Sequence, residues 1–126
     1  MNWAAKRRKV VQLHLETHFY GEAAVVDCSG RLVFKAEAQA LCDRVTELLR
    51  NYRAVVINLN GVNATDGAGL GSIAACVEKA QEAGRILMWC ELQREVRRLL
   101  ELTGMARVLE IYNSEAEALE ACRVAA

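Results

Sequence analysis

The chain has 126 residues, of which 53% are hydrophobic and 25% charged, and its 16 basic and 16 acidic side chains cancel. This composition is typical of one globular domain, and the zero net charge argues against non-specific nucleic-acid binding, which needs a basic excess. No apolar run approaches the roughly 20 residues of a membrane-spanning helix, so direct membrane insertion is not expected. The first residues also lack the apolar core of a secretory signal.

The N-terminal residues differ in character from the rest of the chain. They include the basic tetrad Lys-Arg-Arg-Lys at 6–9. We interpret residues 1–10 as a basic, solvated arm, with contact to an acidic lipid or a partner as the alternative. Residues 11–126 are then the folded domain.

Hydrophobic periodicity predicts elements in the order ββαβαβαβα. Residues 11–19 alternate between apolar and polar side chains, and a turn at Gly21 leads into a second strand over 23–28, so the two strands predict an antiparallel hairpin. Ser29 and Gly30 are expected to end the second strand. The later predicted elements are a helix over 36–50, a strand around 55–59, a helix from 67 to Ala83, a strand over 85–90, a helix over 93–102, a strand over 108–112 and a last helix after Ser114.

The predicted fold is a single α/β domain with a mixed sheet. Each helix after the hairpin returns the chain to a parallel neighbour, and the Val- and Ile-rich strand around 55–59 is expected at the centre. Gly84 is well placed as a C-cap, and Ser114 with Glu117 forms a capping box.

The most informative segment is the turn after the central strand, Asp66-Gly67-Ala68-Gly69-Leu70-Gly71. The Asp66 carboxylate stands at the N-cap position, where it can accept hydrogen bonds from the first amides of the helix. Each glycine costs a helix roughly 1 kcal/mol relative to alanine. Three glycines at one helix start therefore suggest that something approaches this backbone closely.

Three interpretations of the turn remain open. Amides at a helix start form an anion site, but the segment lacks the Lys-Ser/Thr pair of a phosphate-binding loop, and Asp66 would repel an anion. A flat surface with few side chains would suit contact with another protein, which we favour. The glycines could also serve only close helix–sheet packing. The candidate partner-binding residues are Asp66, Gly67, Ala68, Gly69, Leu70, Gly71 and Ser72. Leu70 is expected in the core with Ile73, Ala74 and Val77, and Ser72 is expected on the surface.

Catalytic and metal chemistry have little support in the sequence. Serines occur only at 29, 72 and 114, outside any GxSxG motif, and no catalytic residue is assigned. His14, Glu16 and His18 share one strand face and could ligate a metal ion, but a solvated or covered polar face is the favoured interpretation. We therefore expect no enzyme activity, no metal and no cofactor.

The cysteines are also expected to be structural. They are Cys28, Cys42, Cys76, Cys90 and Cys122. They are widely spaced, odd in number and contain no CxxC pair, so neither a zinc knuckle nor a redox pair is indicated. A reduced, cytoplasmic protein is expected.

Over nearly its whole length the chain resembles a STAS domain, the family of bacterial anti-sigma factor antagonists. The matching segments are 29–32, 55–59 with 61–62, 66–71, 84–87 and 96–104. The resemblance implies that an anti-sigma factor or switch kinase docks at the turn. It also implies a Ser or Thr directly after the aspartate, whose phosphorylation switches binding off. That position is Gly67 here, and the next is Ala68, so neither can accept a phosphoryl group.

Three functions follow as hypotheses. The favoured one is a non-catalytic protein-binding regulatory module, of the anti-sigma factor antagonist type, that lacks the phosphoserine switch. The second, which also rests on the resemblance, is an accessory subunit of an ABC-type lipid transporter. The third is a nucleotide-binding sensor. Thr65 and Ser72 are the nearest hydroxyls that could replace the missing phosphoacceptor, and a homo-oligomer is possible in each case.

Overall fold

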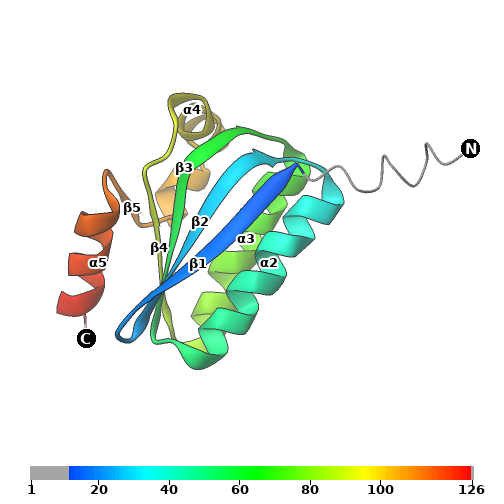
Figure 1. Ribbon diagram of the computed structural model, residues 1–126. Coiled ribbons are helices and arrows are strands. Elements are labelled where there is room, and N and C mark those ends of the chain that lie inside the picture. Colours follow the sequence, from blue (N-terminus) through cyan, green and yellow to red (C-terminus); the bar gives the residue numbers. More distant parts are fainter. Residues whose placement is uncertain (1–11, 126) are drawn as a thin grey trace, which may run out of the picture.

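A computed structural model describes residues 12–125, and in this range the sheet begins with an antiparallel hairpin (Figure 1). Its strands are β1 (Leu13–Tyr20) and β2 (Ala23–Leu32). The predicted hairpin is therefore confirmed. Val11 and the basic arm over 1–10 lie outside the described residues.

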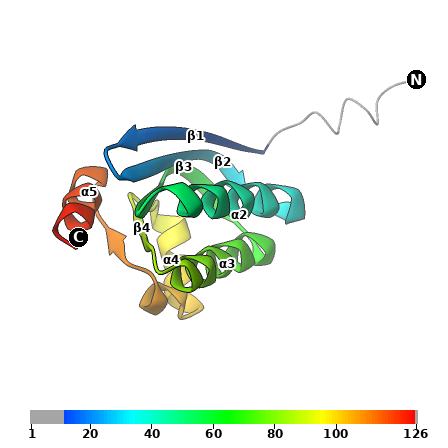
Figure 2. The ribbon, with the colours of Figure 1, turned by 90° about the horizontal axis from the view of Figure 1, so that it is seen from below.

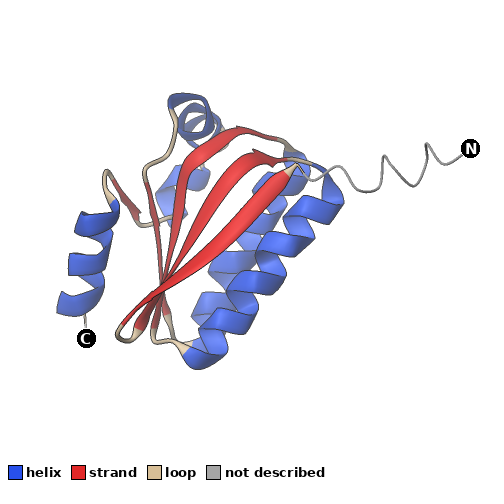
Figure 3. Cartoon of the chain, viewed as in Figure 1, coloured by secondary structure: helices blue, strands red, loops and turns tan. Residues whose placement is uncertain are grey.

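Helices alternate with strands along the rest of the described chain. The elements are α2 (Phe34–Asn51), β3 (Ala54–Thr65), α3 (Gly67–Ala83), β4 (Ile86–Cys90), α4 (Arg94–Leu102), the 3₁₀ helix η1 (Met105–Val108), β5 (Ile111–Tyr112) and α5 (Glu115–Val124). The strand order is β1-β2-β3-β4-β5, and pairing is parallel from β2 onward. This confirms the predicted α/β fold with a mixed sheet and with β3 at its centre (Figure 3).

Several strand boundaries differ from the prediction. β3 continues to Thr65, six residues beyond the predicted end at Leu59. β2 continues to Leu32, so the expectation that Ser29 and Gly30 end it is wrong. Register shifts against β3 flank this segment, and Gly30 has a φ of 106° in a place where a side chain would collide with the carbonyl of Gln12. The glycine therefore lets the strand bulge and continue.

The predicted strand over 108–112 is mostly wrong. Gly104, with a φ of 79°, turns the chain after α4, and the 3₁₀ helix η1 follows it. Met105 and Ala106 pack against the core from this helix, so pairing with β4 is delayed to Ile111 and Tyr112. Local alternation could not anticipate this, because tertiary packing decides where the edge strand starts.

Apolar layers fill the space on both faces of the sheet. α2, α3 and α4 cover one face, where Val55, Ile57 and Trp89 are buried. α5 covers part of the other face, against Val56 and Met88. Figure 2 shows α2 and α3 side by side and α5 apart from them. Burial of each large side chain contributes roughly 1.5 to 3 kcal/mol, so the core holds the end of β3 firmly beneath the turn that follows.

α3 directs a row of small side chains inward. Ser72, Cys76 and Ala80 are buried at a spacing of four residues, which lets α3 pack closely beside α2. Ala74 is exposed, so its predicted place in the core is wrong. The C-cap at Gly84 is confirmed by its φ of 63°.

Candidate functional site

Asp66 connects the starts of two helices. It is the N-cap of α3, and its Oδ1 accepts a hydrogen bond from the Gly69 amide at 3.0 Å, as predicted. Its Oδ2 accepts a hydrogen bond from the amide of Phe34, the first residue of α2, also at 3.0 Å. The bonds from Gly69 and then Phe34 hold the pKa of the Asp66 carboxyl below its usual range. The carboxylate therefore fixes the turn against the start of α2.

The three glycines of the turn have different surroundings. A Cβ at Gly69 would collide with the Thr65 hydroxyl and the Leu32 carbonyl, so this glycine is required for close helix–sheet packing. A Cβ at Gly67 or Gly71 would meet nothing within 4 Å. Packing alone therefore explains one glycine, while the other two leave an open backbone surface at the start of α3.

The two hydroxyls nearest to the turn are used internally. Thr65 Oγ1 donates a hydrogen bond to the Leu32 carbonyl at 2.9 Å, and Ser72 Oγ donates to the Ala38 carbonyl at 2.8 Å. Ser72 is buried, so its expected surface position is wrong; its place between α3 and α2 depends on how the helices pack. Leu70 is partly buried and packs against the core.

Phe34 lies beside the turn, and sequence reasoning missed it. Its side chain is 59% exposed, and its φ of 66° is a conformation that costs a residue with a side chain roughly 1 to 2 kcal/mol. The hydrogen bond from its amide to Asp66 holds the backbone in place. The predicted helix began at Ala36, two residues later, so no periodicity pointed to this ring.

A groove of about 350 Å³ lies on the α4 side of the turn. Its walls are the last residues of β3, 63–65, and the side chains of Glu95, Arg98, Leu99 and Leu102 from α4. Leu102 is 74% exposed. The turn at Asp66 is therefore bordered by an exposed aromatic residue at the start of α2 and by a partly apolar groove against α4.

The polar face of β1 is an ion-pair cluster and not a metal site in the part of the chain that the structure describes. On the polar face of β1, His18 Nε2 lies 3.0 Å from Asp27 Oδ2 and 3.7 Å from Glu16 Oε1, which makes an ion-pair cluster when the imidazole is protonated. Within residues 12–125, no three His, Cys, Asp or Glu side chains are grouped to hold a metal ion. In the same range, no helix has both the length and the apolar character needed to cross a bilayer.

The cysteines are free, and four of them are buried while Cys42 is partly exposed. Burial raises the pKa of the Cys28 and Cys90 thiols to about 12. These thiols stay protonated at neutral pH, where the thiolate is the reactive form. They therefore act as small apolar side chains of the core.

Comparison with known proteins identifies the family. A family model described as the STAS domain matches residues 14–118, which run from the second residue of β1 into α5 and include the turn at Asp66. The chain belongs to the STAS domain family. The turn at Asp66 is thus part of a STAS domain, and the resemblance found in the sequence is confirmed.

Individual relatives of this STAS domain are named as anti-sigma factor antagonists. The anti-sigma F factor antagonist of Paenibacillus polymyxa is 29% identical over 70 residues, which are 56% of this chain and 60% of that protein. The crystal structure of an anti-sigma factor antagonist from Mycobacterium paratuberculosis has a TM-score of 0.77 at 25% identity, covering 88% of this chain and 94% of that one. The Bacillus cell fate determinant SpoIIAA in its phosphorylated form has a TM-score of 0.66 at 12% identity, covering 85% and 97%, which shows a shared fold alone.

Proposed function

We propose that this STAS protein is a non-catalytic regulatory module that binds an anti-sigma factor, a switch kinase or another regulatory protein through residues 66–72. The observation that carries the proposal is the open backbone at Gly67 and Gly71, where nothing lies within 4 Å of an added Cβ. Relatives named as anti-sigma factor antagonists support the kind of partner.

The residues of this segment have two roles: some are accessible to a partner and others hold the turn in position. Gly67, Ala68 and Gly71 offer accessible backbone to the partner, while the buried Gly69 and Ser72 hold α3 in position. Asp66 fixes the turn by its two amide contacts, and Leu70 is partly accessible. Outside the segment, Phe34 and Leu102 are suited to bury apolar area at its flanks, as aromatic and apolar anchors do in interfaces.

This surface works without a phosphoserine switch. Gly67 and Ala68 carry no hydroxyl, and the hydroxyls of Thr65 and Ser72 donate to backbone carbonyls inside the fold. A phosphoryl group would add roughly −1.5 to −2 charges beside the Asp66 carboxylate. Because no accessible acceptor is present in the segment, its charge stays constant and binding is controlled by the partner's own state or concentration.

A phosphate ligand is the less favoured use of the same helix start. The carboxylate of Asp66 already occupies the Gly69 amide, and its pKa lies below the usual range, so it is ionised at neutral pH. An incoming phosphate would meet this negative charge at close range. If ATP or GTP nevertheless bound there, saturating nucleotide would raise the melting temperature.

Matched arginine variants of α3 test the docking surface. Gly71→Arg places a large side chain in open space on the proposed surface, and Gln81→Arg makes the same charge change at an exposed site near the far end of the helix. With the partner isolated from the native cell, we expect Gly71→Arg to weaken binding by at least about thirtyfold in Kd, or ~2 kcal/mol. Gln81→Arg should bind like the unmodified chain. Equal affinities for both variants would contradict the proposed surface.

The absent switch requires its own experiment. The chain is incubated with the partner kinase and ATP, and phosphate incorporation is measured by mass spectrometry. We expect none in the unmodified chain, whereas Gly67→Ser supplies a hydroxyl at the exposed position. Stoichiometric phosphorylation of Thr65 or Ser72 that abolishes binding would refute the constant-charge surface.

A further inference from the structure

Among the described residues, the outer edge of β1 is unpaired and carries few of the usual protections of an edge strand. Within residues 12–125, β1 pairs only with β2, in an unbroken register from Leu13 opposite Gly30 to Tyr20 opposite Ala23. Edge strands are commonly blunted by proline, lysine or a bulge, and the sequence LHLETHFY has no proline or lysine. Figure 2 shows β1 at the outer side of the sheet, with no described element beyond it.

The edge is complementary to itself in one register. If two β1 strands pair antiparallel with Thr17 opposite Thr17 of a second copy, Leu15 lies opposite Phe19 and Glu16 lies opposite His18. Side chains of directly opposite residues share a face of the sheet, so apolar meets apolar on the helix-covered face and acid meets imidazole on the other. Centring the pair on Glu16 would instead place two glutamates opposite each other.

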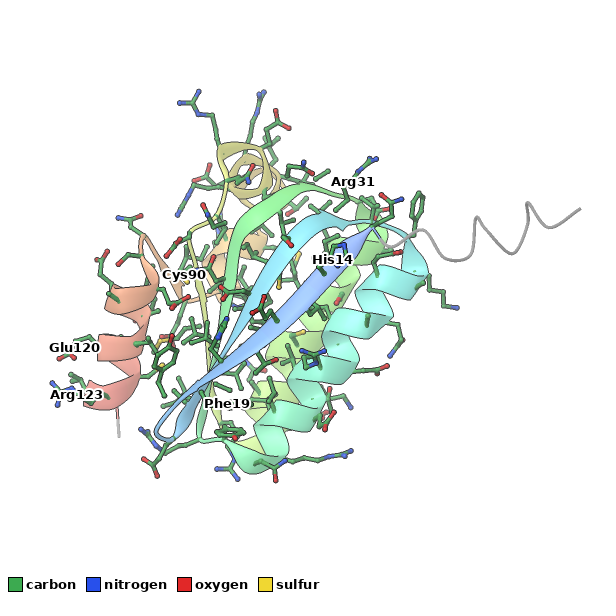
Figure 4. All side chains as sticks on the ribbon, in the orientation of Figure 1. His14, Phe19, Arg31, Cys90, Glu120 and Arg123 are labelled. Carbon is green, nitrogen blue, oxygen red and sulfur yellow. The ribbon has the colours of Figure 1, made fainter. Side chains whose placement is uncertain are left out.

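The side chains of this register are already held in place. Phe19 is 56% exposed and stacks on Tyr52 with ring centroids 5.1 Å apart, so its orientation is fixed before any pairing. Figure 4 shows Phe19 near the hairpin end of β1 and His14 near its start. On the other face, His18 Nε2 lies 3.0 Å from Asp27 Oδ2, so its imidazole is held on the face that would meet Glu16 of the second copy.

From these observations we propose that β1 pairs antiparallel with β1 of a second copy of this chain, joining the two sheets into one. We expect this dimer to be weak. Arg44 Nη1 donates a hydrogen bond to Thr17 Oγ1 at 2.7 Å, so the positively charged guanidinium groups of the two copies would lie near each other at the symmetry axis and repel. The turn after β3 stays accessible in such a dimer, since β3 lies two strands inward from this edge. Pairing at β1 and docking at residues 66–72 are therefore separable.

Sedimentation velocity over a concentration series tests the pairing. We expect the mass to rise with concentration from one chain to two. His18→Glu places a glutamate opposite Glu16 of the other copy at two symmetric positions, and should raise the dissociation constant of the dimer by about tenfold. The double variant Glu16→His with His18→Glu exchanges the two residues and should restore the dissociation constant. Thermal melts check that each variant is folded. A single-chain mass at every concentration, or an unchanged dissociation constant in the folded His18→Glu variant, would overturn the proposal.

Disulfide trapping tests the register independently of those variants. Only position 17 lies opposite itself, at a Cα separation of roughly 4.5 to 5.5 Å, which suits a disulfide. Under mild oxidation Thr17→Cys should therefore cross-link to a dimer much faster than Glu16→Cys or the unmodified chain, whose own thiols are buried except for the partly exposed Cys42. Equal rates for the two cysteine variants would overturn the register.

Discussion

Replacing Gly69 and Gly71 by alanine, one at a time, separates packing from accessibility in the turn. Both variants add one methyl group to the same helix, two residues apart. At Gly69 the methyl collides with the Thr65 hydroxyl and the Leu32 carbonyl, whereas at Gly71 it meets nothing within 4 Å. The two variants should therefore change stability in opposite directions.

The magnitude follows from the contacts. Alanine is favoured over glycine in a helix by about 0.5 to 1 kcal/mol, and Gly71→Ala should gain this amount. At Gly69 the same gain is opposed by overpacking, at roughly 1 to 3 kcal/mol, and by loss of the 2.9 Å hydrogen bond from Thr65 to Leu32, at roughly 0.5 to 1.5 kcal/mol. Because the helix term is common to both, the difference between the variants isolates the collision, at about 1.5 to 4.5 kcal/mol.

Urea unfolding followed by circular dichroism measures this difference directly. Gly71→Ala should shift the midpoint upward and Gly69→Ala should shift it downward, with an unchanged dependence on urea concentration. Equal free energies of unfolding for the two variants would refute the close approach of α3 to the end of β2. A loss of stability in Gly71→Ala would show that this side of the helix is not open.

Three other predictions follow from single contacts. Phe34→Gly should raise the free energy of unfolding by about 0.5 to 1 kcal/mol, because residue 34 has a φ of 66° and glycine adopts this conformation without strain. Phe34→Ala keeps the backbone strain and should bring no such gain, so equal melting temperatures for the two variants would contradict this prediction. Asp66→Asn should flatten the acid side of the stability curve. The folded pKa of Asp66 lies below its unfolded value of about 3.9, so the carboxylate stabilises the fold above that value and this contribution is lost as pH falls through the folded pKa. Parallel pH curves for the two proteins would argue against it. A thiol reagent at neutral pH should label Cys42 promptly and the buried thiols only in denaturant, and rapid labelling of Cys28 would contradict its burial.

The sequence determined most of the architecture, because the deciding signals are local. Alternation in β1 and the apolar run Ala54–Ile57 at the start of β3 are set by which faces are buried, so both strands could be located from the sequence. Caps are equally local: Asp66 accepts from the Gly69 amide as expected, and Ser114 Oγ accepts from the Glu117 amide at 3.1 Å while donating to its carboxylate. The absence of a side-chain hydroxyl at position 67 is also evident from the sequence alone.

The tertiary structure decided which parts of the turn are exposed. Gly69 and Gly71 look alike in the sequence, but the end of β2 passes against only one of them. Ser72 is buried because α2 brings the Ala38 carbonyl to its hydroxyl, 34 residues away in sequence. Phe34 is placed beside the turn by a hydrogen bond from its amide to Asp66 across 32 residues. Local periodicity reports which face of an element is apolar; what lies against that face depends on contacts between segments that are distant along the chain.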